Sequence, residues 1–274
     1  MRGIWLAMAI TACGGAGAPT AGSPDGSPGV DTASPVDAST LVDLDGDGLD
    51  DAYELRLARD YMPFISLDPS DGCPLSGLLV RVRKHPTDAT KILIIYDHLF
   101  SDDCGFNGHV GDDEVFGVAV DPTKPAPAGI LAIKAVSHQN TACERVTECS
   151  TCGGGDARPV CDVAPANGTP WPVVYPSKDK HGQYASRSGC PLIGTCLDQC
   201  TLAASPLHPP IVNAGEPGHP LTTNLTTGGF ITAANGWNHA ELMNFDPWSA
   251  SNFGGAGNIA ADLVDNAFTA APCH

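Results

Sequence analysis

The sequence predicts a mainly β protein: an antiparallel β-sandwich with a few peripheral helices and long loops that disulfides hold in place. Two observations predict it. Short β-branched runs recur along the chain between Gly, Pro and Asp turns, at residues 79–83, 91–96, 114–120, 130–136 and 172–175. Such spacing is typical of a sandwich rather than of alternating strand and helix units. The chain also has 11 cysteines, which is typical of an exported, disulfide-rich protein.

Length and charge limit the number of domains and the kinds of partner. The 274 residues suffice for one domain of roughly 200 residues and an unstructured extension. Acidic residues outnumber basic ones by 31 to 14, so the formal net charge is -17. Because this charge repels phosphate backbones, nucleic acid is excluded as a partner. The excess of carboxylates suits the capture of divalent cations, although it also fits a solvated acidic surface.

The first thirteen residues, MRGIWLAMAITAC, have a basic Arg2 ahead of a short apolar run that ends in Ile10-Thr11-Ala12-Cys13. This ending resembles the lipobox of bacterial lipoproteins. The resemblance implies cleavage before Cys13 and acyl chains on this residue that hold the protein at a membrane. We therefore expect a lipid-anchored protein of the bacterial cell envelope, at the outer membrane or the cell surface. The alternative is a secretory signal cut after residues 16–18, and either signal exports the protein.

Residues 14–40 contain almost no large apolar side chain, so nothing there can offset the entropy of ordering the chain. We expect a disordered tether rich in Gly, Ala, Ser and Pro. The composition becomes globular from about Leu41 onward. The predicted organisation is a signal segment at 1–13, the tether at 14–40, a calcium loop at 41–56 and a disulfide-rich β-sandwich at 57–274.

Two helices are predicted in the globular part. The first covers residues 51–61 and stops before Pro63. The second covers residues 259–268, where an apolar stripe packs on the core while Asp262 and Asp265 face water. The stripe consists of Ile259, Leu263, Val264 and Phe268.

Cysteines after Cys13 form an even set, which predicts five disulfides without choosing their connectivity. We expect Cys273 to pin the end of the chain. Cys149 and Cys152 also have the C-x-x-C spacing of a zinc or redox site, so this alternative stays open. The set is Cys73, Cys104, Cys143, Cys149, Cys152, Cys161, Cys190, Cys196, Cys200 and Cys273.

Residues 43–54, DLDGDGLDDAYE, fit the twelve-residue loop in which oxygens at positions 1, 3, 5, 7, 9 and 12 bind calcium. The predicted ligands are the carboxylates of Asp43, Asp45, Asp47, Asp51 and Glu54 and the carbonyl of Leu49. Gly48 allows the sharp turn. The loop resembles those of EF-hand proteins and, more closely, the single loops of dockerins and thrombospondin type 3 repeats. The resemblance implies a structural calcium ion at the junction of tether and domain.

A second group of metal-ligand residues lies in residues 108–114, GHVGDDE. Period-two alternation places Asp112 and Glu114 on the face of a strand that also carries Phe116. Two carboxylates at the rim of an apolar face need a cation, a basic side chain or water. Glycines around His109 allow a turn toward these carboxylates, and Asp103 lies just upstream with Asp102 before it. Together these residues predict a second divalent-cation site, for calcium or magnesium.

This segment resembles the heptapeptide Gly-His-Arg-His-Asp-Trp-Glu of necrosis- and ethylene-inducing-like proteins, and the His-x-Gly-Asp-Trp-Glu segment of a related vacuolar-sorting-associated family. Residues 57–63, 67–69 and 177–184 are also similar. The resemblance spans roughly residues 55–190. This chain has Gly111 and Asp113 where the first family has its second His and its Trp.

For the necrosis-inducing family, the resemblance implies a β-sandwich whose heptapeptide holds a divalent cation beside a cavity for sphingolipid headgroups. Carried over by position, His109, Asp112 and Glu114 are the ligands, with Asp103 or Asp102 as the fourth. His181 is expected to lie nearby.

Catalytic signatures give no support for an enzyme, because the sequence has no G-x-S-x-G elbow, no H-E-x-x-H helix and no phosphate-binding Gly-Lys-Ser/Thr loop. We therefore expect an exported calcium-binding lipoprotein that binds a glycan, a lipid headgroup or a protein without catalysis. The alternative is a metal-dependent hydrolase or secreted toxin that uses His109, Asp112, Glu114 and His181. A third hypothesis is a purely structural envelope component.

Overall fold

The computed structural model describes residues 41–191 and 196–273. The predicted signal segment with Cys13 and the predicted tether lie outside the described residues. Residues 41–274 form one compact unit. Within its described part, no helix is both long and apolar enough to cross a membrane.

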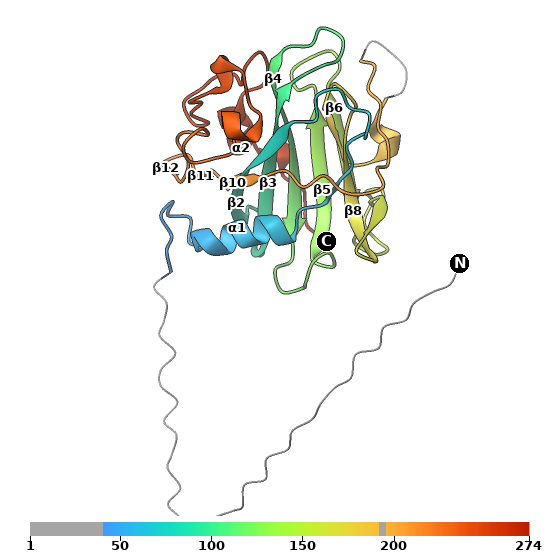
Figure 1. The fold of residues 1–274 in the computed structure, drawn as a ribbon. Coiled ribbons are helices and arrows are strands. Elements are labelled where there is room, and N and C mark those ends of the chain that lie inside the picture. The colour runs from blue at the N-terminus through green and yellow to red at the C-terminus, as the bar shows by residue number, and fades with distance from the viewer. Residues whose placement is uncertain (1–40, 192–195, 274) are drawn as a thin grey trace, which may run out of the picture. The chain divides into compact units, whose positions relative to one another are not determined.

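A six-stranded sheet forms the centre of this unit, in the order β10-β2-β3-β4-β5-β6 (Figure 1). It contains four of the predicted β-branched runs. Neighbouring strands within it are antiparallel, except for β10 and β2, which are parallel. Its strands are β2 (Ser76–His85), β3 (Asp88–Asp102), β4 (Val110–Val120), β5 (Ile130–Ser137), β6 (Arg145–Ser150) and β10 (Ile211–Asn213). The strands extend beyond the apolar runs because polar residues continue the hydrogen-bonded ladders.

A smaller sheet packs against one face of the large sheet and carries the fifth predicted run. Its strands are β1 (Phe64–Ile65), β7 (Val163–Ala166), β8 (Thr169–Pro176) and β9 (Gln183–Tyr184). Val174 of β8 shares a buried core with Ile94 and Phe116 of the large sheet. A separate hairpin consists of β11 (Gly215–Glu216) and β12 (His219–Pro220). The mainly β, sandwich-like class predicted from the sequence is confirmed, with two short parallel pairs added.

The two faces of the large sheet cover different cores because successive side chains of a strand point to opposite sides. Leu78 and Val80 of β2 lie in the first core, between the two sheets and α1 (Asp51–Asp60). Leu79 lies in the second core, which residues 214–268 cover. This covering segment is mostly irregular, with the 3-10 helices η2 (Ala233–Asn235) and η3 (Ala240–Leu242). A further 3-10 helix, η1 (Arg187–Gly189), follows β9.

The helix α1 confirms the first helix prediction and ends one residue earlier than expected. Asp50 caps its N-terminus by accepting a hydrogen bond from the backbone N–H of Tyr53 at 2.9 Å. Ala58 is fully buried, and its carbonyl accepts a hydrogen bond of 2.7 Å from the hydroxyl of Tyr96 in β3. The helix is thereby fixed to the sheet directly after the predicted calcium loop.

The second helix prediction was wrong in length and in the side it assigned to two residues. The chain forms α2 (Ile259–Val264) and then the 3-10 helix η4 (Asn266–Phe268), because Asp265 caps a new turn by accepting from Ala267 N at 2.7 Å. Asp262 is buried, whereas Val264 is 45% exposed. In this short helix Ile259, Asp262 and Leu263 share one face, since they are spaced by three and four residues.

Five disulfides join the ten remaining cysteines, as the even count predicts. Cys149 pairs with Cys161 and Cys152 pairs with Cys273, so the zinc or redox alternative for the C-x-x-C spacing was wrong. The second of these bonds pins the end of the chain, as expected. The other pairs are Cys73–Cys104, Cys143–Cys196 and Cys190–Cys200.

Candidate calcium loop and acidic cavity

The predicted calcium loop, residues 43–54, turns around its own carboxylates. Asp43 accepts hydrogen bonds from the backbone N–H groups of Gly46 at 2.7 Å and Gly48 at 3.0 Å. Both glycines have left-handed backbone, with φ of 77° and 87°. Such values favour glycine, because a Cβ atom would strain the turn.

Carboxylate oxygens of the loop gather in two overlapping groups whose ligand atoms lie within 4.8 Å of one another. One group holds Asp43, Asp45 and Asp51, and the other holds Asp45, Asp47 and Glu54. Leu49 donates its N–H to Asp47 at 2.7 Å and packs its side chain against the first core. All six predicted ligand residues therefore belong to one turn of the chain, with Asp45 shared by both groups.

Three oxygens in the loop are buried without any hydrogen-bond partner: Asp45 Oδ2, Asp47 Oδ2 and Glu54 Oε1. The other oxygen of Glu54 accepts a hydrogen bond of 2.7 Å from the side chain of Asn213, at the end of β10. A buried and unpartnered polar oxygen costs free energy. Three of them facing a common space fit a cation, which oxygen ligands of this kind bind.

Carboxyl groups of the loop have raised pKa values, because the acids are buried and lie close together. Burial, with the charges of Asp47 and other neighbours, raises the pKa of Asp45 to about 6. Burial and neighbouring carboxylates also raise the pKa of Glu54 to about 8, although its hydrogen bond from Asn213 opposes the rise. Without a cation, the folded loop therefore disfavours the ionised form of both side chains.

The second predicted group lies at the start of β4, where Asp112 and Glu114 share a face with Phe116 as alternation predicts. The structure does not gather its members around one point. Asp112 Oδ2 lies 3.1 Å from His181 Nδ1, and Glu114 Oε1 lies 3.9 Å from His138 Nδ1. Each carboxylate thus has a different histidine beside it.

Asp103 and His109 form a separate pair, with Asp103 Oδ2 3.7 Å from His109 Nε2. Lys180 also donates a hydrogen bond to Asp103. Asp102 points elsewhere, with Oδ1 3.0 Å from Nε2 of His239. Among the described residues, no three of the predicted ligands His109, Asp112, Glu114 and Asp103 bring ligand atoms within 4.8 Å of one another.

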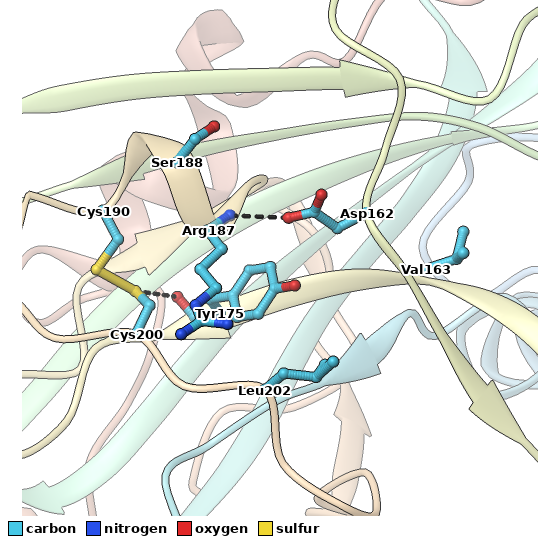
Figure 2. A pocket seen from close by; sticks show the side chains of 8 residues that line it. All are labelled: Asp162, Val163, Tyr175, Arg187, Ser188, Cys190, Cys200 and Leu202. Carbon is cyan, nitrogen blue, oxygen red and sulfur yellow. Dashed lines mark hydrogen bonds between the residues drawn. A yellow bond between two sulfur atoms is a disulfide. The ribbon is translucent and has the colours of Figure 1, made fainter.

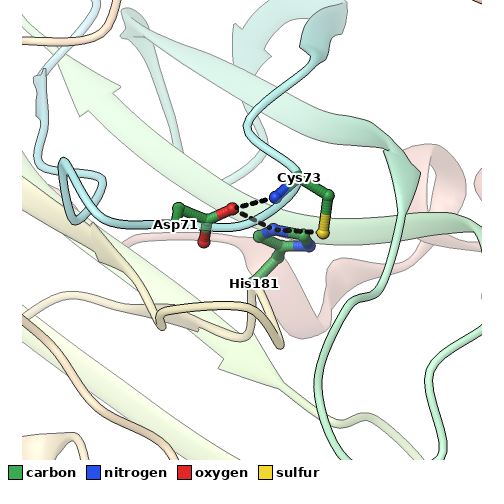
Figure 3. Close-up of side chains that lie close together, drawn as sticks. All are labelled: Asp71, Cys73 and His181. Carbon is green, nitrogen blue, oxygen red and sulfur yellow. Dashed lines mark hydrogen bonds and ion pairs between the residues drawn. The ribbon is translucent and has the colours of Figure 1, made fainter.

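His181 is fully buried between two acids and stacks on Phe100, with 3.7 Å between the ring centroids. Burial alone would lower its pKa. Hydrogen bonds from its ring to Asp112 and Asp71 outweigh this effect and raise the pKa to about 9. Figure 3 shows His181 beside Asp71 and Cys73. Cys73 belongs to a disulfide, so it has no thiolate to offer, and these three residues are not a metal site.

A cavity of about 560 Å³ nevertheless brings the predicted residues together in its wall. We call it the acidic cavity, because five carboxyl side chains line it, together with Lys180 and two histidines. The acids are Asp103, Asp112, Asp113, Glu114 and Asp262, and the histidines are His109 and His138. Sequence reasoning missed His138, whose Nε2 lies 2.7 Å from Oδ2 of the buried Asp198.

Asp113 of β4 and Asp262 of α2, both in this wall, form a group with the buried Asp97 of β3 that the sequence did not predict, and we call it the inner carboxylate cluster. Burial and the neighbouring acids raise the pKa of Asp97 and Asp113 well above the usual range. Burial and the charge of Asp265 raise the pKa of Asp262 to about 6, although hydrogen bonds with the side chain of Asp113 and the backbone of Asn258 oppose the rise. Asp97 gave one signal, since it is a charged residue inside a run of large apolar side chains.

A second cavity, also of about 560 Å³, lies over the smaller sheet. Figure 2 shows its lining, where the backbone N–H of Arg187 donates to the carboxylate of Asp162 at 3.0 Å. The disulfide Cys190–Cys200 borders it. Asp162 and Arg187 are the charged residues among the side chains that line it, and none of the predicted site residues does.

Comparisons with known proteins give little. No protein-family model matches the chain, and no curated protein is similar to it by sequence. Two solved structures are similar in part. One, described as "Toxin fold for microbial attack and plant defense", is 15% identical with a TM-score of 0.32. The other, described as "NLPPya in complex with glucosamine", is 13% identical with a TM-score of 0.34. Each likeness covers 58% of this chain and 72% of the other.

Proposed function

We propose that this chain is an exported calcium-binding protein whose β domain binds an extracellular ligand without catalysis. The observation that carries the calcium proposal is the set of three buried, unpartnered oxygens on Asp45, Asp47 and Glu54. A calcium ion would satisfy all three at once. Calcium is favoured over magnesium because it accepts six to eight oxygen ligands in flexible geometry, whereas magnesium retains several waters.

Calcium in this loop would connect three parts of the fold. Glu54 lies in the first turn of α1, and its free oxygen faces the loop while the other accepts from Asn213 of β10. The loop is closed by a hydrogen bond of 2.9 Å from the backbone N–H of Asp51 to the carbonyl of Val42. The bound ion would therefore hold the start of the domain to the edge of the large sheet.

Calcium titration by calorimetry of the full chain tests this proposal. Wild type should bind calcium in an event that Glu54→Gln weakens by at least about tenfold, since the charged carboxylate ligand is lost. Asp50→Asn is the matched control: it removes one negative charge from the same loop at a position that is not a predicted ligand, and asparagine still caps α1. Equal binding by wild type and Glu54→Gln would refute the site.

The acidic cavity is the proposed ligand site. Its carboxylates and histidines accept and donate hydrogen bonds, which suits a hydroxyl-rich glycan or a polar lipid headgroup. Its negative charge disfavours phosphate-rich partners. Several of its acid and base groups are paired with one another, as in the contact between Lys180 and Asp103, and this pairing favours binding over proton transfer.

A glycan array, followed by vesicles with and without a glycosphingolipid, tests the ligand proposal. Asp112→Asn combined with Glu114→Gln should abolish any binding found, because both side chains line the cavity. Retention of binding by this double variant would place the ligand elsewhere.

A metal-dependent hydrolase or secreted toxin is the second candidate. One observation favours it: His138 and Glu114 line the same cavity with 3.9 Å between Nδ1 and Oε1, so a bound substrate would face both an acid and a base that are not hydrogen-bonded to each other. Turnover of polysaccharide or headgroup substrates, lost in Glu114→Gln, would establish it. No turnover on any of them would remove it.

The lipid anchor at Cys13 and the second divalent cation, calcium or magnesium, at His109, Asp112, Glu114 and Asp103 remain proposals as well. Mass spectrometry of the mature protein from a bacterial host should find acyl chains on Cys13, and Cys13→Ser should release the protein from membranes. Cleavage after residues 16–18 would instead support a secreted form. Metal content of wild type compared with the Asp112→Asn, Glu114→Gln variant tests the cation.

A further inference from the structure

The inner carboxylate cluster joins three elements that are distant in the sequence. Asp97 lies in the middle of β3, Asp113 near the start of β4 and Asp262 in α2. Their carboxylate oxygens lie within 4.8 Å of one another. All three side chains are buried, with exposed fractions of 0%, 7% and 5%. Three acids therefore face one small space in the interior.

No group in the described residues balances this charge. Both oxygens of Asp97 are buried without a hydrogen-bond partner, and those of Asp113 have none except the carboxyl group of Asp262. In residues 41–191 and 196–273, none of the three acids forms an ion pair within 4 Å. Desolvated, unpaired carboxylates are among the costliest arrangements in a fold. A cation bound among them removes that cost.

The cluster is accessible from the acidic cavity. Asp113 and Asp262 line the cavity, whereas Asp97 lies behind them. Gly257, at the cavity wall, lies so close to Asp113 that a Cβ atom there would be 1.2 Å from Oδ1. The glycine thus leaves room for the carboxylate at a place where any other residue would displace it. An ion can enter from the cavity, and water there can complete its coordination.

We propose that Asp97, Asp113 and Asp262 bind a divalent cation, calcium or magnesium, at the inner wall of the acidic cavity. The ligands are oxygens alone, with no sulfur or imidazole, which selects these hard cations. The bound ion ties α2 to β3 and β4. It also turns the most acidic part of the cavity wall into a site where a ligand oxygen can bind.

This site differs from both of the predicted ones. The calcium loop lies at the start of α1, outside the acidic cavity. Asp113 points to the opposite face of β4 from Asp112 and Glu114, because neighbours in a strand alternate. Asp113 shares its side with Val115, which lies in the second core, whereas Phe116 lies in the first. The cation therefore lies on the side that α2 covers.

Metal content of the full chain tests the proposal. After treatment with chelator and reloading with calcium or with magnesium, excess ions are removed and the bound metal is counted by mass spectrometry. Asp97→Asn should bind one ion fewer than wild type. The same substitution, made in the Asp112→Asn, Glu114→Gln variant, should again remove one ion.

An unchanged ion count in Asp97→Asn overturns the proposal. Loss of an ion by Asp97→Asn only when Asp112 and Glu114 are intact also overturns the proposal, since that ion would belong to the predicted site on the other face. If Asp97→Asn does not fold, Asp262→Asn replaces it, because Asp262 belongs to a peripheral helix and retains the same test.

Thermal melting separates metal binding from a merely structural role. In chelator, Asp97→Asn should melt at or above the temperature of wild type, because asparagine is neutral at a position where Asp97 must either bind a proton or repel its acidic neighbours. On addition of calcium or magnesium, the melting temperature of wild type should rise more than that of the variant. A variant that is less stable than wild type by the same amount in both conditions would contradict the site.

Discussion

The effect of Glu54→Gln on the free energy of unfolding should change sign with calcium: the substitution should stabilise the ion-free protein and destabilise the calcium-bound protein. Glu54 is fully buried, and in the ion-free fold burial and neighbouring acids raise its pKa from the ordinary 4.5 to about 8. A difference of one in pKa corresponds to about 1.4 kcal/mol. Ionising Glu54 therefore costs the ion-free folded protein on the order of 5 kcal/mol above pH 8.

The direction of the pH dependence follows from proton binding. Unfolded Glu54 loses its proton near pH 4.5, whereas the ion-free folded protein keeps it to about pH 8. Between these values the folded state binds more protons, so its stability falls as the pH rises. Glutamine at this position has no proton to lose, so its stability should fall much less over the same range.

Urea denaturation in chelator, measured from about pH 5 to about pH 9, tests this reasoning. In the alkaline range Glu54→Gln should be more stable than wild type, and with saturating calcium the order should reverse. Asp50→Asn should follow wild type in both series. Equal pH dependence of wild type and Glu54→Gln in chelator, or a variant that is less stable in both conditions, would refute the account.

Three further predictions concern the domain. Cys152→Ser combined with Cys273→Ser opens a loop of 121 residues and should lower the free energy of unfolding by about 5 kcal/mol through chain entropy. Removal of Cys190–Cys200, which closes a loop of 10 residues, should lower it by about 3 kcal/mol, and urea titrations without reductant measure both values. His181→Asn leaves Asp112 and Asp71 without their histidinium partner and should lower the free energy of unfolding by roughly 3–5 kcal/mol near pH 7. Because the pKa of His181 in the folded protein is raised to about 9, this loss should be full below about pH 6.5 and should shrink as the pH rises through 9. Gly257→Ala must displace Asp113 as well as strain the backbone and should cost roughly 2–4 kcal/mol in the same titration. Gly168→Ala is the control, because Gly168 has a similar left-handed φ but open space around its Cβ position, and it should cost only the backbone strain, about 1 kcal/mol. Equal costs would contradict the close approach.

Local patterns predicted those parts of the structure that local chemistry determines. The loop at residues 43–54 and the helix after it follow from spacing within twelve residues, and both form as turn and helix in the structure. Runs of β-branched residues located the strands β2, β3, β4, β5 and β8, but not β6, β7 or β10, and alternation placed Asp112 and Glu114 on one face. The identity of any bound ion remains a prediction.

Long-range pairing could not be predicted in the same way. Asp71 meets His181 across 110 positions, and His138 meets Asp198 across 60, so no spacing rule brings them together. Asp262 was expected to face water because it lies off the predicted apolar stripe of Ile259, Leu263, Val264 and Phe268. The cap at Asp265 shortens α2, and the remaining face turns Asp262 inward toward Asp113.

The most direct test of the calcium proposal is a crystal structure of the full chain grown with calcium, with anomalous scattering recorded at long wavelength. The account predicts an anomalous peak among Asp45 Oδ2, Asp47 Oδ2 and Glu54 Oε1, at about 2.3–2.6 Å from each. The absence of a peak there, with the three oxygens bonded to water or to one another, would contradict the central claim.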